Sequence, residues 1–112
     1  MSKDGLLGTF EEQVLLAIVH AGENAYGMQI RRQIEERIGR SVTIGAVYST
    51  LDRLENKGFA SSWLAGAEAV RRGRPRRYFR LEAAGAIALE AAREAHAHMW
   101  RGVSLDSEAT KS

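Results

Sequence analysis

The chain has 112 residues, which fits a single domain with one modest hydrophobic core. It contains no cysteine, so neither disulfide bonds nor thiolate metal sites are expected, and its formal net charge is only +2. No apolar run approaches the roughly 18 residues that a membrane-spanning helix needs, and the first residues lack the basic-then-apolar form of a signal peptide. These features favour a soluble cytoplasmic protein without a membrane partner, a metal or another cofactor.

The first predicted element is a helix that begins near Thr9 and ends at Gly22. Thr9 and Glu12 have the spacing of a capping box. Apolar residues recur at helical intervals between these ends, at Phe10, Val14, Leu15, Ile18 and Ala21. Gly22 stands where a left-handed C-terminal cap is expected.

Two further helices are predicted from their apolar stripes and end signals. The second covers residues 26–38 and stops at Gly39, and its stripe contains Tyr26, Ile30, Ile34 and Ile38. The third begins after an N-cap at Thr43 and stops at Gly58, and its stripe contains Ile44, Val47, Leu51 and Leu54. The opposite face of the third helix is small and polar near its start, as in helices that enter the major groove of DNA.

Beyond Gly58 the apolar pattern alternates, which predicts a β-hairpin. The strands would cover residues 59–65 and 76–81, around a glycine- and arginine-rich tip over residues 66–73. Pro75 lies at the mouth of the second strand, where a missing backbone donor is tolerated. The apolar character of the segment after the first strand leaves the position of the turn open.

Positive charge is concentrated on this hairpin. Residues 71–80 contain no acid and six arginines, which are Arg71, Arg72, Arg74, Arg76, Arg77 and Arg80. The rest of the chain is slightly acidic, so a defined contact with a polyanion is expected. The planar arginine side chain bonds phosphate oxygens in pairs, which suits this role. Arg80 lies nearer the core, where pairing with an acid is the alternative.

The last predicted helix covers residues 82–101 and is rich in alanine. Propensity alone gives an isolated helix only marginal stability, so a partner helix from a second copy is expected. The expected dimer interface consists of Ile87, Leu89, Ala91, Ala95, Met99 and Trp100. The polar, aperiodic tail that follows, residues 102–112, is expected to be disordered.

Two stretches of sequence are distinctive as an ordered pair, TIGAVYSTLDRLENKG at residues 43–58 and GRPRRYFRL at residues 73–81. Together with the first helix and the pairs Tyr26-Gly27 and Ala84-Gly85, they resemble the PadR family of transcriptional regulators. The single C-terminal helix is similar to the short branch of that family. Glu82 is a departure, because the family usually has threonine at this place.

The resemblance implies a mainly α fold with a small β-hairpin. A winged helix-turn-helix domain (1–81) would precede a C-terminal dimerisation helix (82–101) and the tail (102–112). It also implies a sequence-specific DNA-binding regulator, a homodimeric repressor on a pseudo-palindromic operator, released by a small aromatic or drug-like inducer. A possible ligand pocket at the dimer interface would involve His96, Met99 and Trp100. Ordinary burial of Trp100 in the dimer is the favoured alternative to that pocket.

The expected DNA contacts lie on the third helix and the hairpin. They are Thr43, Gly45, Ala46, Tyr48, Ser49, Arg53, Arg72, Arg74, Arg76 and Arg77. Packing against the wing is the alternative role for Tyr48. The rival function is a protein–protein docking module without DNA binding, which would not require the arginine cluster. An enzyme is not expected, because the sequence lacks a nucleophile elbow, a phosphate-binding glycine loop and a zinc-protease signature.

Overall fold

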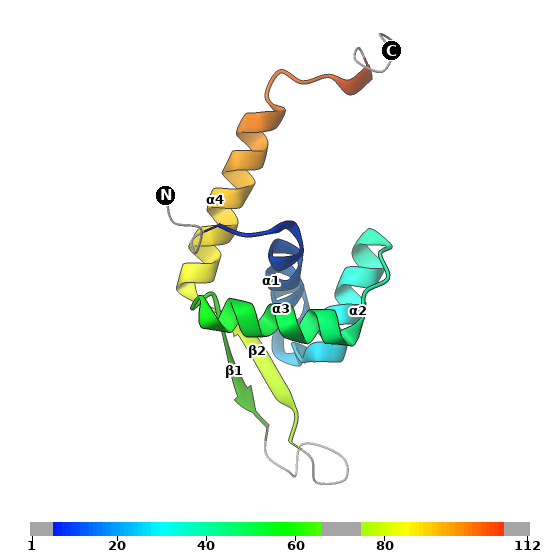
Figure 1. Ribbon diagram of the computed structural model, residues 1–112, viewed down its shortest axis with the longest axis vertical. Helices are drawn as coiled ribbons and strands as arrows, with labels where there is room; N and C mark the ends of the chain where they lie inside the picture. Colours follow the sequence, from blue (N-terminus) through cyan, green and yellow to red (C-terminus); the bar gives the residue numbers. More distant parts are fainter. Residues whose placement is uncertain (1–5, 66–74, 107–112) are drawn as a thin grey trace.

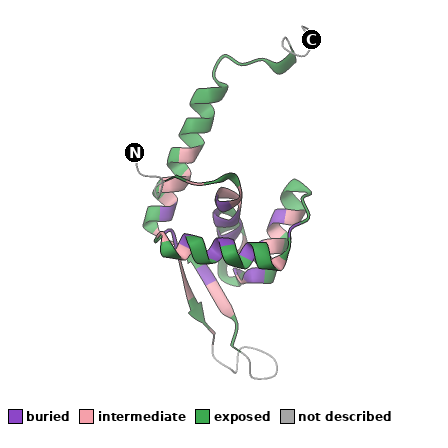
Figure 2. Ribbon diagram, in the orientation of Figure 1, coloured by how far each residue is buried: buried purple, intermediate pink, exposed green. Residues whose placement is uncertain are grey.

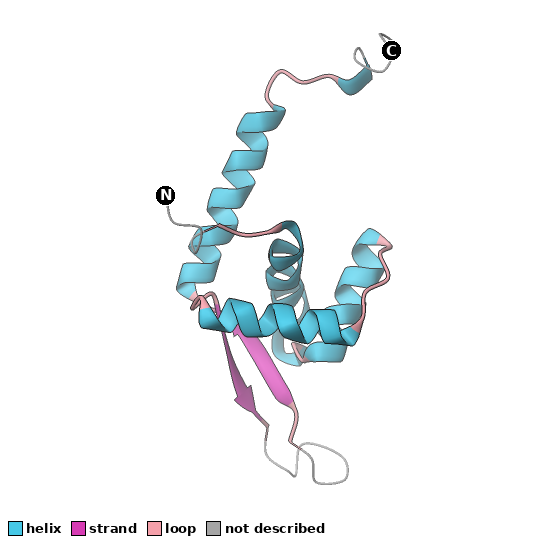
Figure 3. Cartoon of the chain, viewed as in Figure 1, coloured by secondary structure: helices cyan, strands magenta, loops and turns pink. Residues whose placement is uncertain are grey.

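The computed structural model describes residues 6–65 and 75–106 (Figure 1). Its elements follow the chain in the order α1 (Thr9–Ala21), a 3₁₀ turn η2 (Gly22–Asn24), α2 (Gly27–Ile38), α3 (Ile44–Asn56), β1 (Ala60–Leu64), β2 (Arg77–Leu81) and α4 (Ala83–Trp100). Helices dominate and the two strands form one hairpin (Figure 3). The mainly α fold with a small β-hairpin is therefore confirmed. The predicted hairpin tip (66–73) and the end of the predicted tail (107–112) lie outside the described residues.

The start of α1 differs from the prediction by one residue. Gly8, not Thr9, is the N-cap, with an extended backbone at φ −72° and ψ 164°. The Glu11 carboxylate accepts a hydrogen bond from the Gly8 backbone N–H at 2.8 Å. The predicted pairing of Thr9 with Glu12 is wrong because Thr9 is already helical, which turns Glu12 towards α4 instead.

Helices α1, α2 and α3 enclose one core together with the hairpin (Figure 2). The predicted stripes supply most of it, including Val14, Leu15, Ile18, Ile30, Ile34, Val47, Leu51 and Leu54. Ile38 is an exception to the predicted stripe of α2, since it is half-exposed at the end of that helix. Phe79 of β2 closes the core from the hairpin side and is almost fully buried.

The hairpin is joined to the helices by backbone hydrogen bonds. Its strands are antiparallel, with Ser62 opposite Phe79 and Trp63 opposite Tyr78. The Phe79 N–H donates to the Ala25 carbonyl at 2.8 Å, and an isolated antiparallel bridge between Tyr26 and Tyr78 joins the segment before α2 to β2. This attachment matters because a two-stranded hairpin alone is at best marginally stable.

Helix α4 is attached to the rest of the fold at its first two turns. The Glu82 N–H donates to the Phe59 carbonyl at 2.9 Å, and Gly85 lies buried against the same carbonyl. Leu89 is half-buried against the core, whereas every residue from Arg93 to Trp100 is exposed. Figure 1 shows the helix projecting away from the three-helix unit. None of the helices in the described ranges has the length and apolar character needed to cross a membrane.

Candidate nucleic-acid interface

The exposed beginning of α3 is built from small residues. Thr43 caps the helix, because its Oγ1 accepts a hydrogen bond from the Ala46 backbone N–H at 3.1 Å. A Cβ added at Gly45 would meet no atom within 4 Å, so this position opens to solvent. The Ser49 hydroxyl, one turn further, donates to the Gly45 carbonyl at 2.9 Å. Such short side chains let the helix backbone approach a grooved partner closely.

Tyr48 lies against the start of α2. A Cβ built at Gly27 would come within 2.4 Å of the Tyr48 hydroxyl oxygen, so glycine is needed there for this contact. The Tyr48 side chain remains partly exposed beside the N-terminal turn of α3. The contact gives a physical reason for the Tyr26-Gly27 pair in the sequence.

A buried acid holds the other end of α3. Glu11 of α1 is only 8% exposed and pairs with Lys57 at 3.0 Å and with Arg53 at 3.6 Å. Burial raises the pKa of the Glu11 carboxyl, but the Gly8 N–H, Lys57 and Arg53 together outweigh it and hold the pKa below its usual value. Arg53, expected to contact DNA, therefore has an acidic partner, although 56% of its side chain stays exposed.

Arg76 and Arg77 are neighbours in sequence with different surroundings. Arg77 pairs with Asp52 at 3.3 Å and with Glu55, both on α3. Arg76 is exposed, and its guanidinium lies 4.1 Å from the centre of the Tyr26 ring. Within the described part of the chain Arg76 has no ion pair.

An aromatic row supports Arg76 on the face of the hairpin opposite Phe79. The Tyr26 ring packs edge-on against Tyr78 at 5.6 Å, and Tyr78 stacks on Trp63 at 5.8 Å. Arg80 lies over Trp63 and pairs with Glu82 at 3.6 Å, so it has the acidic partner that the sequence offered as an alternative to DNA contact, although 71% of its side chain is exposed. Two further predicted wing contacts lie outside the described residues, Arg72 and Arg74.

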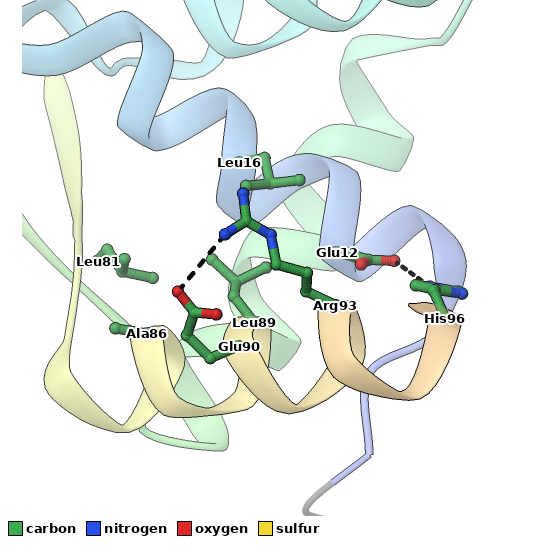
Figure 4. Close-up of a pocket in the computed structure, with 8 residues that line it drawn as sticks. All are labelled: Glu12, Leu16, Leu81, Ala86, Leu89, Glu90, Arg93 and His96. Atoms are coloured by element: carbon green, nitrogen blue, oxygen red, sulfur yellow. Dashed lines mark hydrogen bonds and ion pairs between the residues drawn. The ribbon is translucent and has the colours of Figure 1, made fainter. Parts of the chain in front are cut away.

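The predicted dimer residues of α4 do not all face the same way. Ile87, Met99 and Trp100 are 72%, 77% and 58% exposed, and Ala91 and Ala95 are exposed with them. Leu89 instead turns towards α1, where it lines a groove of about 410 Å³ (Figure 4).

That groove contains one of the three predicted ligand-pocket residues. His96 lines it and approaches Glu12 of α1 at 3.3 Å, between Nε2 and Oε1 (Figure 4). Met99 and Trp100 lie further along α4 and are not part of its lining. In the described ranges no group of three or more His, Asp and Glu side chains could hold a metal ion.

The sequence matches the transcriptional regulator PadR-like family over residues 15–91. The chain belongs to this family. Both stretches that carried the resemblance lie inside the matched range, one on α3 and one leading into β2. As a PadR-like protein it is a DNA-binding transcriptional regulator and not an enzyme.

Solved structures of two PadR-like regulators and of RosR share the fold. A PadR-like transcription factor from Bacteroides fragilis has a TM-score of 0.68 and 22% identity, with 82% of this chain and 84% of that chain covered. A PadR family regulator from hypervirulent Clostridium difficile has a TM-score of 0.65 and 22% identity, with 92% of this chain and 99% of that chain covered. RosR from H. salinarum has a TM-score of 0.65 and 25% identity, with 94% of this chain and 87% of that chain covered. No curated protein matches the sequence.

Sequence reasoning missed the acids that fix this PadR-like α3 in place. No role was predicted for Glu11, Asp52 or Glu55, which pair with Lys57 or with Arg77 in the folded chain. A signal for Asp52 and Glu55 was present, since carboxylates beside a phosphate-binding wing would repel DNA unless a cation neutralised them.

Proposed function

We propose that this PadR-like regulator is a homodimeric repressor that binds a pseudo-palindromic operator and is released by a small aromatic or drug-like molecule. The observation that carries the proposal is the open, small-residue start of α3 beside a hairpin whose Arg76 is exposed and has no acid partner among the described residues. Together they offer one surface for base edges and another for phosphates.

The proposed DNA contacts divide by chemistry. Thr43, Gly45, Ala46 and Ser49 stand where α3 would enter the major groove, and glycine and alanine there permit close approach without hydrogen bonding to bases. Tyr48 and Arg53 flank them and would contact phosphates. Arg72, Arg74 and Arg76 would bond the backbone from the wing, which supplies affinity more than sequence preference.

The proposed dimer uses the exposed side of α4. Trp100, eleven residues after Leu89, lies on the Leu89 side of the helix and is also exposed, whereas Ile87 and Met99 present large apolar groups to solvent on another side. The alanines between them, Ala91 and Ala95, would let a second α4 pack closely. An inducer bound near Trp100 would bias the angle between the two α4 helices and so the separation of the two DNA-reading units.

The DNA-binding part is tested with duplexes selected by the protein from a random-sequence library, followed by titration of the best duplex and of a scrambled one. A pseudo-palindromic consensus with half-sites about one helical turn apart supports the proposal. Failure to enrich any sequence, together with early elution from heparin, favours a docking module instead. Repression is tested separately, with a reporter whose promoter carries the selected sequence.

The dimer is tested by sedimentation of wild type and of Met99→Lys, which places a charge on the exposed side of α4. Met28→Lys is a matched control, because Met28 is an exposed methionine on α2. We expect wild type and the control to sediment as dimers and Met99→Lys to shift towards monomer. A stable wild-type monomer at micromolar concentration contradicts the dimer.

A further inference from the structure

Every nitrogen of the Arg77 guanidinium has a partner within the protein. Nε donates to the Ser62 hydroxyl of β1 at 3.1 Å, Nη1 lies 3.3 Å from Asp52 Oδ1, and Nη2 donates to Glu55. The plane of the group also rests 4.8 Å from the centre of the buried Phe79 ring. The side chain is 35% exposed, so its orientation is set by these contacts rather than by solvent.

Glu55 closes the set of contacts into a network. One of its carboxylate oxygens accepts a hydrogen bond from the Arg77 guanidinium, and the other accepts one from the Ser62 hydroxyl at 2.8 Å. Ser62 thus accepts from Arg77 and donates to Glu55. We call these four residues, Arg77, Ser62, Glu55 and Asp52, the Arg77 network. It joins both strands of the hairpin to the C-terminal half of α3.

The charges of the network argue against a phosphate at Arg77. One guanidinium faces two carboxylates, so a DNA phosphate brought to this point would meet an excess of negative charge. Turning Arg77 towards DNA would also leave Glu55 half-buried without its cation. Arg76, one residue earlier, pairs with no acid among the described residues and instead lies over the Tyr26 ring.

The network connects the two surfaces that would meet DNA. A two-stranded hairpin is flexible unless something holds it, and charge-assisted bonds to a fork-shaped guanidinium fix direction as well as distance. Besides the Phe79–Ala25 backbone bond, which joins the hairpin to the segment before α2, the network directly constrains the angle between the wing, which would bond phosphates, and α3, which would meet base edges. Sequence-specific binding needs the phosphate contacts of the wing and the base contacts of α3 at once, whereas non-specific binding to any duplex needs only the phosphate contacts.

We propose that Arg77 is a positioning residue that fixes the wing relative to α3 and thereby raises the preference for operator over random DNA, and that it does not bind phosphate. This inference rests on the proposed DNA-binding function. It departs from the expectation that Arg77 contacts DNA together with Arg72, Arg74 and Arg76.

The test compares Arg76→Gln with Arg77→Gln, two neighbouring substitutions of identical chemistry. Affinity is measured at several salt concentrations for the duplex selected from random sequence and for a scrambled duplex. Arg76→Gln should weaken both duplexes alike and flatten the salt dependence by about 0.9 in log–log slope for each phosphate that the protein no longer neutralises. Arg77→Gln should leave that slope unchanged and weaken the selected duplex roughly 10-fold more than the scrambled one.

Glu55→Gln is a second test, because phosphate binding by Arg77 and a positioning role for Arg77 predict opposite changes in DNA affinity for this variant. If Arg77 bound phosphate, removing the nearby acid would tighten DNA binding. As a partner in the network, Glu55→Gln should instead lower the selected-to-scrambled ratio, as Arg77→Gln does, and the double variant should be no worse than either single one. Arg77→Lys should also lower the ratio, because a single ammonium cannot reproduce the fork, whereas it would still bind a phosphate.

Thermal melting of each variant ensures that only folded protein is compared. A reduced salt slope for Arg77→Gln, or tighter binding by Glu55→Gln, overturns the positioning role while leaving the DNA-binding function intact. Failure of the wild type to bind any duplex overturns the proposed function instead. The two failures are therefore distinguishable within one set of titrations.

Discussion

Replacing Glu11 by glutamine should destabilise the protein more than any other single carboxylate-to-amide change among the described residues. The substitution keeps the size of the side chain but removes its charge. The carboxylate receives the Gly8 N–H at 2.8 Å and the Lys57 ammonium at 3.0 Å, and it is nearly buried. An amide nitrogen in its place would face Lys57 with a donor against a donor.

The size of the effect follows from these contacts. Hydrogen bonds to a charged group contribute about 1.5–3 kcal/mol net. The pairing with Arg53 is discounted, because more than half of that side chain is exposed and such pairs contribute little. We therefore expect a loss of about 2 kcal/mol at neutral pH, which lowers the melting temperature of a domain of this size by roughly 10 °C.

The loss should depend on pH in one direction. The folded-state pKa of Glu11 lies below its ordinary value of 4.5, although burial acts to raise it, because Gly8, Lys57 and Arg53 favour the charged form. A carboxyl with a depressed folded pKa stabilises the fold above the unfolded pKa and ceases to do so as pH falls through the folded value. The difference in melting temperature between wild type and Glu11→Gln should thus be large at neutral pH and shrink in acid.

Circular dichroism melts of the two proteins from neutral pH to about pH 3 measure this difference. Glu36→Gln is the control, since Glu36 is exposed on α2 and has no ion pair among the described residues. It should melt like wild type throughout. A gap between wild type and Glu11→Gln that stays constant across the pH range would refute the argument, as would the absence of any gap at neutral pH.

Three other substitutions probe α3, α2 and α4. Gly85→Ala should destabilise the fold by about 1–3 kcal/mol in denaturant titrations, because the new methyl group would lie 2.2 Å from the Phe59 carbonyl oxygen, which cannot move aside. Gly27→Ala should leave stability within about 1 kcal/mol of wild type in the same titrations yet displace Tyr48, seen as a change in tyrosine NMR shifts, since the group it meets is the end of a side chain. Thr43→Ala should lower stability by about 1 kcal/mol, measured by chemical unfolding, through loss of the N-cap of α3.

Local signals explain why most of the fold could be predicted. Gly22, Gly39 and Gly58 all have positive φ angles where the sequence predicted helix ends, although Gly22, at φ 59° and ψ −125°, does not adopt the left-handed helical conformation predicted for it. The change from helical to alternating apolar residues after Gly58 placed the hairpin correctly. These features are read from a few neighbouring residues, so no knowledge of the packing is needed.

The candidate site could be predicted only in outline, because its decisive contacts are long-range. Counting charge along the chain placed Arg77 with five other arginines, but the acids that neutralise it come from α3, 22 and 25 residues away. In the same way, Leu89 fits the apolar pattern of α4 but turns towards α1 in the folded chain. The sequence pattern predicts which side chains lie on a segment, whereas only the fold shows which residues from distant segments they contact.

The attachment of α4 has a consequence for how a signal could travel. The helix has 18 residues and so spans about 27 Å, but its buried contacts lie at its base, around Gly85 and Leu89. The helix could therefore tilt as a rigid rod about a pivot at the Phe59 carbonyl. A tilt of about 10° at that pivot would displace the far end by about 5 Å, many times the tolerance of a hydrogen bond. In a dimer joined through α4, the fit to DNA would thus be governed by a few atoms at the pivot that never touch the DNA.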